Sequence, residues 1–277
     1  QRVAVHRRAD GYVFGVDTVR SLGLDLPLAL AAAATMLLAG VLALRQDKLK
    51  RGLAYSTVSQ LSYIVLGIAL LTPAAVFGAL LHLVAHAFMK TTLFFVAGAI
   101  YVETDVEYVG EMAGIWRRLP ATMTAFAIGS AGLVGLPGVA GFVSKWYLVL
   151  GALESEAALF AGVFLAAGLL KLLFFWPVLL NAFAGREALA GFRPLPGGRN
   201  TSDALETDGG DASDGGGDAS ESGHVSDPDW DRRTPLAESR WTLLAPILVT
   251  AGVAVVLGIV PDATPFWDLA RAVSTEV

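Results

Sequence analysis

The chain has 277 residues, of which 55% are hydrophobic and 16% are charged, and its mean hydropathy is +0.59. Average soluble domains are about 25% charged, so this composition excludes an ordinary soluble globular domain and favours a membrane protein. The absence of cysteine excludes disulfides, thiolate metal sites and cysteine nucleophiles. The net charge of −5 is unevenly placed, because residues 197–233 hold ten acidic but three basic residues and the rest of the chain carries about +2.

The first residues contain neither an initiating Met nor the pattern of a signal peptide. We interpret the chain as part of a longer protein, and residues 1–26 as an extramembrane or interfacial lead-in. A membrane crossing needs about 20 mostly apolar helical residues. Six segments approach or exceed that length, and they cover residues 27–44, 53–71, 74–100, 120–153, 157–183 and 241–260. These segments predict an all-α membrane protein with about six transmembrane helices.

The segment 120–153 is too long for one straight crossing and is interrupted by a Gly-Leu-Pro-Gly sequence at residues 135–138. Proline removes a helical hydrogen bond and glycine tolerates unusual backbone dihedrals, so we predict a broken helix. The predicted organisation is therefore five transmembrane helices within residues 27–184, an acidic insert over 185–240, a last crossing over 241–260 and a C-terminal tail over 261–277.

The basic residues predict the orientation in the membrane. Three connectors on one side carry almost all the Lys and Arg between crossings, so we place these loops in the cytoplasm of a cell whose plasma membrane holds the protein. The acidic insert lies on the same side. Its Gly, Ser and Asp composition contains few large apolar residues, and we expect it to be disordered.

Titratable bases inside apolar segments are the main functional signal, because a Lys near a helix centre costs about 2.5–3.5 kcal/mol on insertion scales. His82, His86 and Lys90 follow one another at a spacing of four residues, which places them on one stripe of a helix. Lys145 follows the predicted break. Histidine titrates near neutral pH, so this set predicts a proton relay. The alternatives are histidines satisfied by nearby hydroxyls or carbonyls, and lysines that cap a half-helix or reach the interface.

Lys171 lies near the middle of the segment 157–183, and a relay role and snorkelling to the interface are equally good interpretations of it. A metal site is a poorer interpretation of the histidines. The spacing of His82 and His86 suits zinc, but the Glu of an HExxH motif is missing and no third ligand is apparent.

Three motifs, in order, resemble one family. Residues 47–60 read DKLKRGLAYSTVSQ, residues 82–90 read HLVAHAFMK, and residues 136–146 read LPGVAGFVSKW. Each is similar to a motif of the antiporter-like proton-translocating subunits found in respiratory complex I and in Mrp-type sodium/proton antiporters. The resemblance covers nearly the whole chain except the acidic insert.

The resemblance implies a fourteen-helix fold with two inverted five-helix repeats, of which the present spans would be the second repeat and the last helix. It implies that Lys145 is the broken-helix lysine of the second half-channel. It also implies that His82, His86 and Lys90 form the connecting relay and that Lys50 lies at the cytoplasmic edge. Ser59 and Ser144 are further candidates for the pathway, and Lys171 has no implied role. The Glu and the broken-helix Lys of the first repeat have no match here.

Our hypothesis is a subunit of a multisubunit sodium/proton antiporter, more similar in sequence to the D-type Mrp subunits, that moves protons along these buried bases. It predicts partners among other membrane subunits, protons and sodium as transported ions, and neither cofactor, covalent chemistry nor nucleic-acid binding. One alternative is a proton-pumping subunit of a complex I-like or hydrogenase assembly. The other is a structural membrane subunit or truncated half-gene that transports nothing.

Overall fold

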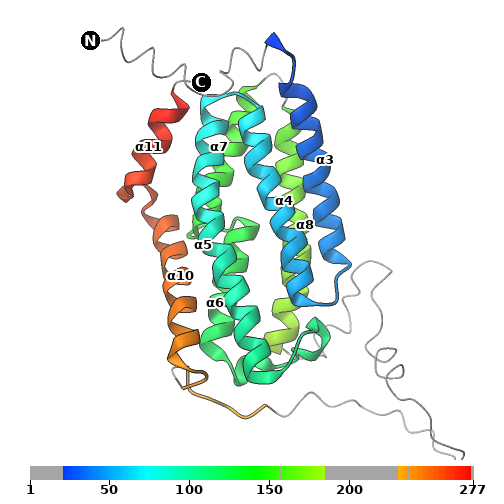
Figure 1. Ribbon diagram of the computed structural model, residues 1–277, viewed down its shortest axis with the longest axis vertical. Coiled ribbons are helices and arrows are strands. Elements are labelled where there is room, and N and C mark those ends of the chain that lie inside the picture. The colour runs from blue at the N-terminus through cyan, green and yellow to red at the C-terminus, as the bar shows by residue number, and fades with distance from the viewer. Residues whose placement is uncertain (1–20, 156–157, 185–229, 236, 276–277) are drawn as a thin grey trace, which may run out of the picture.

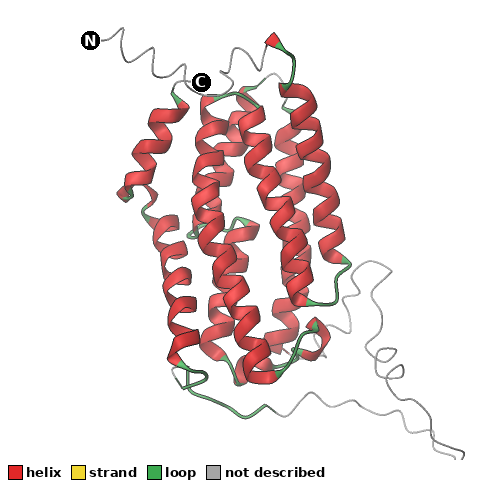
Figure 2. Cartoon of the chain, in the orientation of Figure 1, coloured by secondary structure: helices red, strands yellow, loops and turns green. Residues whose placement is uncertain are grey.

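The computed structural model describes residues 21–155, 158–184, 230–235 and 237–275, and these residues form a helical bundle (Figure 1). The predicted all-α membrane fold is confirmed, since α-helices account for nearly all of the regular structure in the described ranges (Figure 2). The helices are α3 (Asp25–Leu44), α4 (Leu49–Ala69), α5 (Pro73–Thr104), α6 (Pro120–Val134), α7 (Ala140–Glu154), α8 (Leu159–Ala184), α10 (Trp241–Ile259) and α11 (Pro265–Ser274).

Five of these helices, namely α3, α4, α5, α8 and α10, are long and apolar enough to cross a membrane. The remaining expected crossing is made by α6 and α7, each of which has 15 residues. Helices of this length extend about 22 Å, so neither spans a hydrocarbon core of about 30 Å alone. Together they form the predicted broken helix, α7 packing beside the first half of α5 and α6 beside its second half.

The break between α6 and α7 is encoded by glycine and proline. Gly135 ends α6 in the left-handed conformation with φ +96°, which a residue with a Cβ atom rarely adopts. Pro137 cannot supply a helical N–H, and α7 starts anew at Ala140. The two halves then overlap closely, because a Cβ atom on Gly141 would collide with the carbonyl oxygen of Gly132.

The structure differs from the predicted insert at its C-terminal end. We expected disorder up to residue 240, but the described residues just before α10 pack against the loop between α5 and α6. Trp230 donates its indole N–H to the Ala113 carbonyl at 2.7 Å, and the Arg233 amide donates to the Arg117 carbonyl at 3.1 Å. The sequence signal for this packing was Trp230, a large aromatic residue among polar ones. The remainder of the predicted insert, residues 185–229, lies outside the described residues.

Glu238 fixes the start of the broken helix. Its side chain is fully buried and accepts hydrogen bonds from the backbone N–H groups of Ala121 and Thr122, both at 2.7 Å, and from the Thr122 hydroxyl at 2.5 Å. The first N–H groups of a helix have no partner within the helix, and a negative charge at this end is favoured by the helix dipole. The segment before α10 therefore holds α6 at its N-terminus.

Replacing Glu238 by Gln should lower the stability of the protein by about 1–2 kcal/mol, because the amide NH2 would face a backbone donor and the negative charge would be lost. The measurement is the thermal midpoint of the purified protein in detergent. Glu111→Gln removes an exposed carboxylate from the same end of the molecule and is the matched control. Equal midpoints for the two variants would contradict this role of Glu238.

Candidate functional site

One face of α4 carries the groups that contact the buried bases. The carbonyl of Leu53 and the side chains of Ser56, Gln60 and Tyr63 are spaced three, four and three residues apart, so they form one stripe along the helix. Each of them contacts a lysine or histidine from another helix, and Ser59 contacts a further lysine beside the stripe. The candidate site is thus a row of bases arranged along α4.

The helix break supplies two acceptors for Lys145. Its ammonium group donates to the carbonyl of Leu133 and, at 3.1 Å, to the carbonyl of Val134. These carbonyls belong to the last turn of α6 and lack helical partners because the helix stops at Gly135. The negative end of the α6 dipole also favours a cation here. The ammonium group lies 5.0 Å from the centre of the Tyr63 ring, a cation–π contact.

His82 is fully buried and is hydrogen-bonded through both ring nitrogens. Its Nε2 lies 2.8 Å from Oε1 of Gln60, and its Nδ1 lies 2.8 Å from the hydroxyl of Ser144. Gln60 in turn donates its amide N–H to the Leu133 carbonyl at 2.9 Å, which is the carbonyl that Lys145 also uses. Leu133, Gln60, His82, Ser144 and Lys145 therefore close a polar ring around the helix break.

Gly78 permits the contact between His82 and Ser144. It lies one helical turn before His82, and a Cβ atom there would meet the backbone of α7 at 2.7 Å from the Leu148 nitrogen and 2.9 Å from the Ser144 carbonyl oxygen. Helices that touch backbone to backbone need a residue without a side chain at the crossing. The glycine brings α5 and α7 close enough for a short serine side chain to reach the imidazole.

His86 and Lys90 continue the row along α5. The His86 ring stacks on that of His82 with 6.1 Å between centroids, and its buried Nε2 atom has no hydrogen-bond partner. Lys90 donates to the Leu53 carbonyl at 2.8 Å and to the Ser56 hydroxyl. The predicted stripe of His82, His86 and Lys90 thus points into the bundle, toward α4.

Lys171 lies inside the bundle on the neighbouring side of α4. Its side chain is fully buried and donates to the Ser59 hydroxyl at 2.6 Å, and Ser59 donates to the Met36 carbonyl at 2.8 Å. The snorkelling alternative is therefore wrong for this residue. Lysine side chains are long enough to point either way from a helix centre, so the sequence alone left both directions open.

Lys50 is the one predicted pathway residue that the structure keeps apart from the others. It is exposed at the start of α4, with its ammonium group 4.3 Å from the centre of the Tyr101 ring. The residues that sequence reasoning missed are Gln60, Ser56 and Tyr63. Their three-four spacing within an apolar segment was a usable signal, because polar groups in a membrane helix seldom face lipid.

Among the described residues, no carboxylate pairs with a lysine of the row. The ion pairs within the described ranges join Lys48 to Glu107 and Arg233 to Glu103, so none involves Lys90, Lys145 or Lys171. Hydroxyl and carbonyl oxygens are their hydrogen-bond acceptors. The part of the chain that the structure describes also contains no group of three or more His, Asp or Glu residues that could hold a metal ion.

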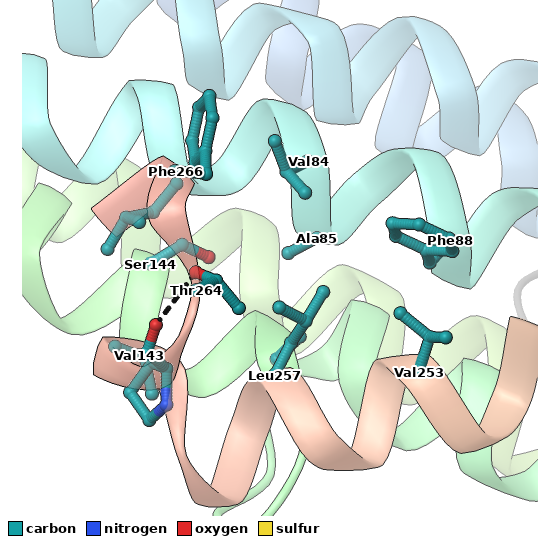
Figure 3. Close-up of a pocket in the computed structure, with 12 residues that line it drawn as sticks. Val84, Ala85, Phe88, Val143, Ser144, Val253, Leu257, Thr264 and Phe266 are labelled. Atoms are coloured by element: carbon teal, nitrogen blue, oxygen red, sulfur yellow. Dashed lines mark hydrogen bonds between the residues drawn. The ribbon is translucent and has the colours of Figure 1, made fainter. Parts of the chain in front are cut away.

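A cavity of about 260 Å³ lies beside Ser144, between α5, α7 and the bend joining α10 to α11 (Figure 3). Side chains such as Val84, Phe88, Val143 and Leu257 make its lining predominantly apolar. Thr264, the other hydroxyl residue in the lining, donates to the Pro261 carbonyl at 3.0 Å. The polar row reaches this cavity at Ser144, whose hydroxyl also contacts His82.

These features define a helical protein of the membrane interior with a row of titratable bases beside a broken helix. Residues 14–171, more than half of the chain, match the family described as NADH:quinone oxidoreductase/Mrp antiporter, transmembrane, and the chain belongs to this family. The family resemblance inferred from the three motifs is thereby confirmed.

Two relatives illustrate the similarity. NADH-quinone oxidoreductase subunit N of Desulforudis audaxviator is 45% identical over 168 residues, covering 61% of this chain and 32% of the relative. The D-type subunit of the Na(+)/H(+) antiporter of Alkalihalophilus pseudofirmus is 34% identical over 166 residues, covering 60% of this chain and 34% of the relative. The chain thus spans about a third of the length of these curated relatives.

Solved structures show the same fold. A chain of the Mrp complex from Dietzia sp. DQ12-45-1b superposes with a TM-score of 0.69 and 25% identity, over 91% of this chain and 47% of that one. A chain of respiratory complex I from Thermus thermophilus superposes with a TM-score of 0.65 and 19% identity, over 92% of this chain and 45% of that one.

The ion pair of Lys48 and Glu107, 2.6 Å apart, ties the loop before α4 to the loop after α5, where the Leu49 amide also bonds the Glu107 carbonyl. The hydrogen bond from Lys48 lowers the pKa of Glu107 below its ordinary 4.5, and the same bond raises the pKa of Lys48 above 10.5. The stability that Glu107 contributes to this contact is fully present above pH 4.5 and is lost as the pH falls through its lowered pKa. That of Lys48 is present below pH 10.5 and is lost as the pH rises through its raised pKa.

Hydrogen-exchange protection factors of the Leu49 and Val109 amides should therefore be constant at neutral pH and fall at acidic pH, below the ordinary pKa of Glu107. Glu107→Gln should remove the acid-side fall, because the titrating group is gone. An unchanged acid-side fall in this variant would show that another group causes it.

Gly78→Ala should destabilise the protein by about 1–3 kcal/mol, because the new methyl group collides with backbone atoms that cannot rotate away. Gly98→Ala on the same helix is the matched control, since a Cβ atom there meets nothing within 4 Å. The thermal midpoints of the two variants in detergent provide the comparison. A Gly78→Ala midpoint as high as that of Gly98→Ala would contradict the close crossing of α5 and α7.

Proposed function

We propose that this chain is the proton-translocating part of a subunit in a multisubunit sodium/proton antiporter, and that protons pass along its buried bases. The observation that carries the proposal is the row formed by Lys145, His82, His86 and Lys90 along one side of α4. Within the described residues, His82, Lys90 and Lys145 are hydrogen-bonded to hydroxyl, amide and carbonyl oxygens and not to carboxylates, and Nε2 of His86 has no partner. Such groups can accept and release a proton without having to break an ion pair.

The route follows from the contacts. Lys145 is adjacent to Ser144 on α7, the Ser144 hydroxyl contacts Nδ1 of His82, and His82 stacks on His86, while Gln60 orients the imidazole from its other side. The unpartnered Nε2 of His86 is placed to exchange a proton with a bridging water molecule, one helical turn before Lys90. Lys90 reaches the Leu53 carbonyl, which lies one turn from the start of α4 and so near that end of the bundle.

Lys171 and Ser59 form a second contact on α4, next to the residue that binds His82. We include them as a side branch of the same pathway. We also include Lys50, a surface lysine at the start of α4, which is the end near Lys90. The basic connectors support a cytoplasmic location for that end, in a protein of the plasma membrane. Other membrane subunits are the expected partners, because the relatives are named as members of multisubunit complexes.

A second candidate is a proton-pumping subunit of a complex I-like assembly, and the 45% identity to an NADH-quinone oxidoreductase subunit N favours it. The two candidates share the proton route and differ in what drives it. Sealed vesicles holding the complete assembly distinguish them: a sodium gradient drives proton movement in the antiporter, whereas quinone reduction drives it in the pump.

Lys145→Ala in the complete assembly should abolish proton movement in sealed vesicles, because the ring around the helix break loses its titratable ammonium group. The measurement is the collapse of an imposed pH gradient on addition of sodium, followed with a pH-sensitive dye. Arg51→Met removes an exposed basic side chain at the start of α4 and is the control for expression and assembly.

Full proton movement with Lys145→Ala, at normal assembly levels, would contradict the proposal. That result would favour a structural subunit that transports nothing.

A further inference from the structure

The hydroxyl of Ser144 has two possible acceptors and one proton. Its oxygen lies 2.8 Å from Nδ1 of His82 and 3.2 Å from the carbonyl oxygen of Gly141. A serine hydroxyl donates one hydrogen bond and can accept others. If it donates to His82, the imidazole nitrogen must be unprotonated. If it donates to Gly141, its lone pairs are free to accept a proton-bearing Nδ1.

Gln60 determines whether the other ring nitrogen of His82, Nε2, carries a hydrogen. Its amide NH2 group donates to the Leu133 carbonyl, which can only accept, and this orients the amide oxygen toward His82. An amide oxygen also only accepts, so Nε2 of His82 must carry a hydrogen at all times. The titrating position of His82 is therefore Nδ1, which faces Ser144.

We infer that Ser144 is a hydroxyl switch that lets His82 take up and release a proton on Nδ1 without movement of any heavy atom. With neutral His82, Ser144 donates to Nδ1. To protonate His82, a water molecule in the cavity that Ser144 lines gives a proton to the Ser144 oxygen as the serine passes its own hydroxyl proton to Nδ1. Nδ1 then donates to Ser144, whose new hydroxyl proton is donated to Gly141, and release of the proton reverses these steps. Both charge states then keep the two hydrogen bonds of the imidazole at the same heavy-atom positions, and only the Ser144–Gly141 bond is made or lost, which limits reorganisation during proton transfer. The inference rests on the proposed function, in which His82 carries protons.

The groups around His82 are consistent with a switch at this position. On α4 it faces Gln60 and the Tyr63 ring, whose centroid lies 5.5 Å away, and on its own helix it faces His86. On α7 it faces Ser144 and the adjacent Lys145, a like charge when both are protonated. Repulsion between like charges disfavours protonating His82 and Lys145 at the same time. A proton that arrives at one of them therefore favours release from the other.

Ser130 provides a matched control for Ser144. Both serines are fully buried, both belong to the broken-helix pair, and each hydroxyl lies within hydrogen-bond distance of the carbonyl three residues earlier in its own helix, 2.9 Å for Ser130 and Ala127. They differ in that Ser144 also contacts His82. Any effect of removing a buried hydroxyl from these half-helices in general appears in both Ser→Ala variants.

The test uses Ser144→Ala, Ser144→Thr and Ser130→Ala in the complete assembly, with the initial rate of sodium-driven proton movement in vesicles as readout. Ser144→Ala should lower the rate about 10- to 100-fold, the range expected when a hydrogen bond to a charged group is lost. Ser144→Thr keeps the hydroxyl and should recover most of that loss, and Ser130→Ala should transport at the wild-type rate. Equal rates for Ser144→Ala and Ser130→Ala would overturn the inference.

A spectroscopic readout tests the same switch without transport. The ¹⁵N spectrum of the histidine-labelled assembly, with His82→Gln used to assign the signal, should show neutral His82 protonated on Nε2. A ring protonated on Nδ1 would overturn the inference. His82→Gln and Lys145→Ala separate the two levels of the proposal: if these variants also transport normally, the proposed function fails. If they abolish transport while Ser144→Ala does not, the hydroxyl switch alone is wrong.

Discussion

The described part of this bundle depends on accommodating bases in its interior without pairing them to acids. A lysine near the centre of a membrane helix costs about 2.5–3.5 kcal/mol on insertion scales, and Lys90, Lys145 and Lys171 all lie within predicted crossings. Carboxylates would offset that cost, but they would also hold the protons in place. The structure offers hydroxyl and carbonyl oxygens instead. These stabilise an ammonium group less strongly than a carboxylate does.

Two structural devices supply those oxygens. The first is α4, whose serines and glutamine form a polar stripe in a helix that otherwise packs with apolar residues. The second is the break between α6 and α7, which frees the carbonyls of Leu133 and Val134 from helical bonding. The break exists because of Gly135 and Pro137, and it stays compact because Gly132 and Gly141 allow the half-helices to touch. Local sequence thus creates the acceptors, and close helix packing brings the bases to them.

The sequence predicts the parts of this site that depend on spacing along one helix. The stripe of His82, His86 and Lys90 follows from a four-residue repeat, and the break follows from glycine and proline. Contacts between helices are harder to predict from the sequence. Gln60 and Leu133 are 73 residues apart, and their meeting depends on how α4 and α6 rotate about their own axes. The inward direction of Lys171 and the packing of Trp230 and Glu238 depend on tertiary contacts in the same way.

The position of Lys171 shows how the row could branch. Lys171 bonds Ser59, and the next residue, Gln60, bonds His82, so one peptide unit of α4 separates a lysine of α8 from the histidine of α5. Ser59 also donates to Met36 on α3, which links this contact to the pair of helices that packs on the opposite side from α10 and α11 (Figure 1). The polar groups therefore extend in two directions from the middle of α4: along α5 toward Lys90, and across the bundle toward α3 and α8. A proton on His82 would stand at the junction of these two directions, which is where the Ser144 hydroxyl acts.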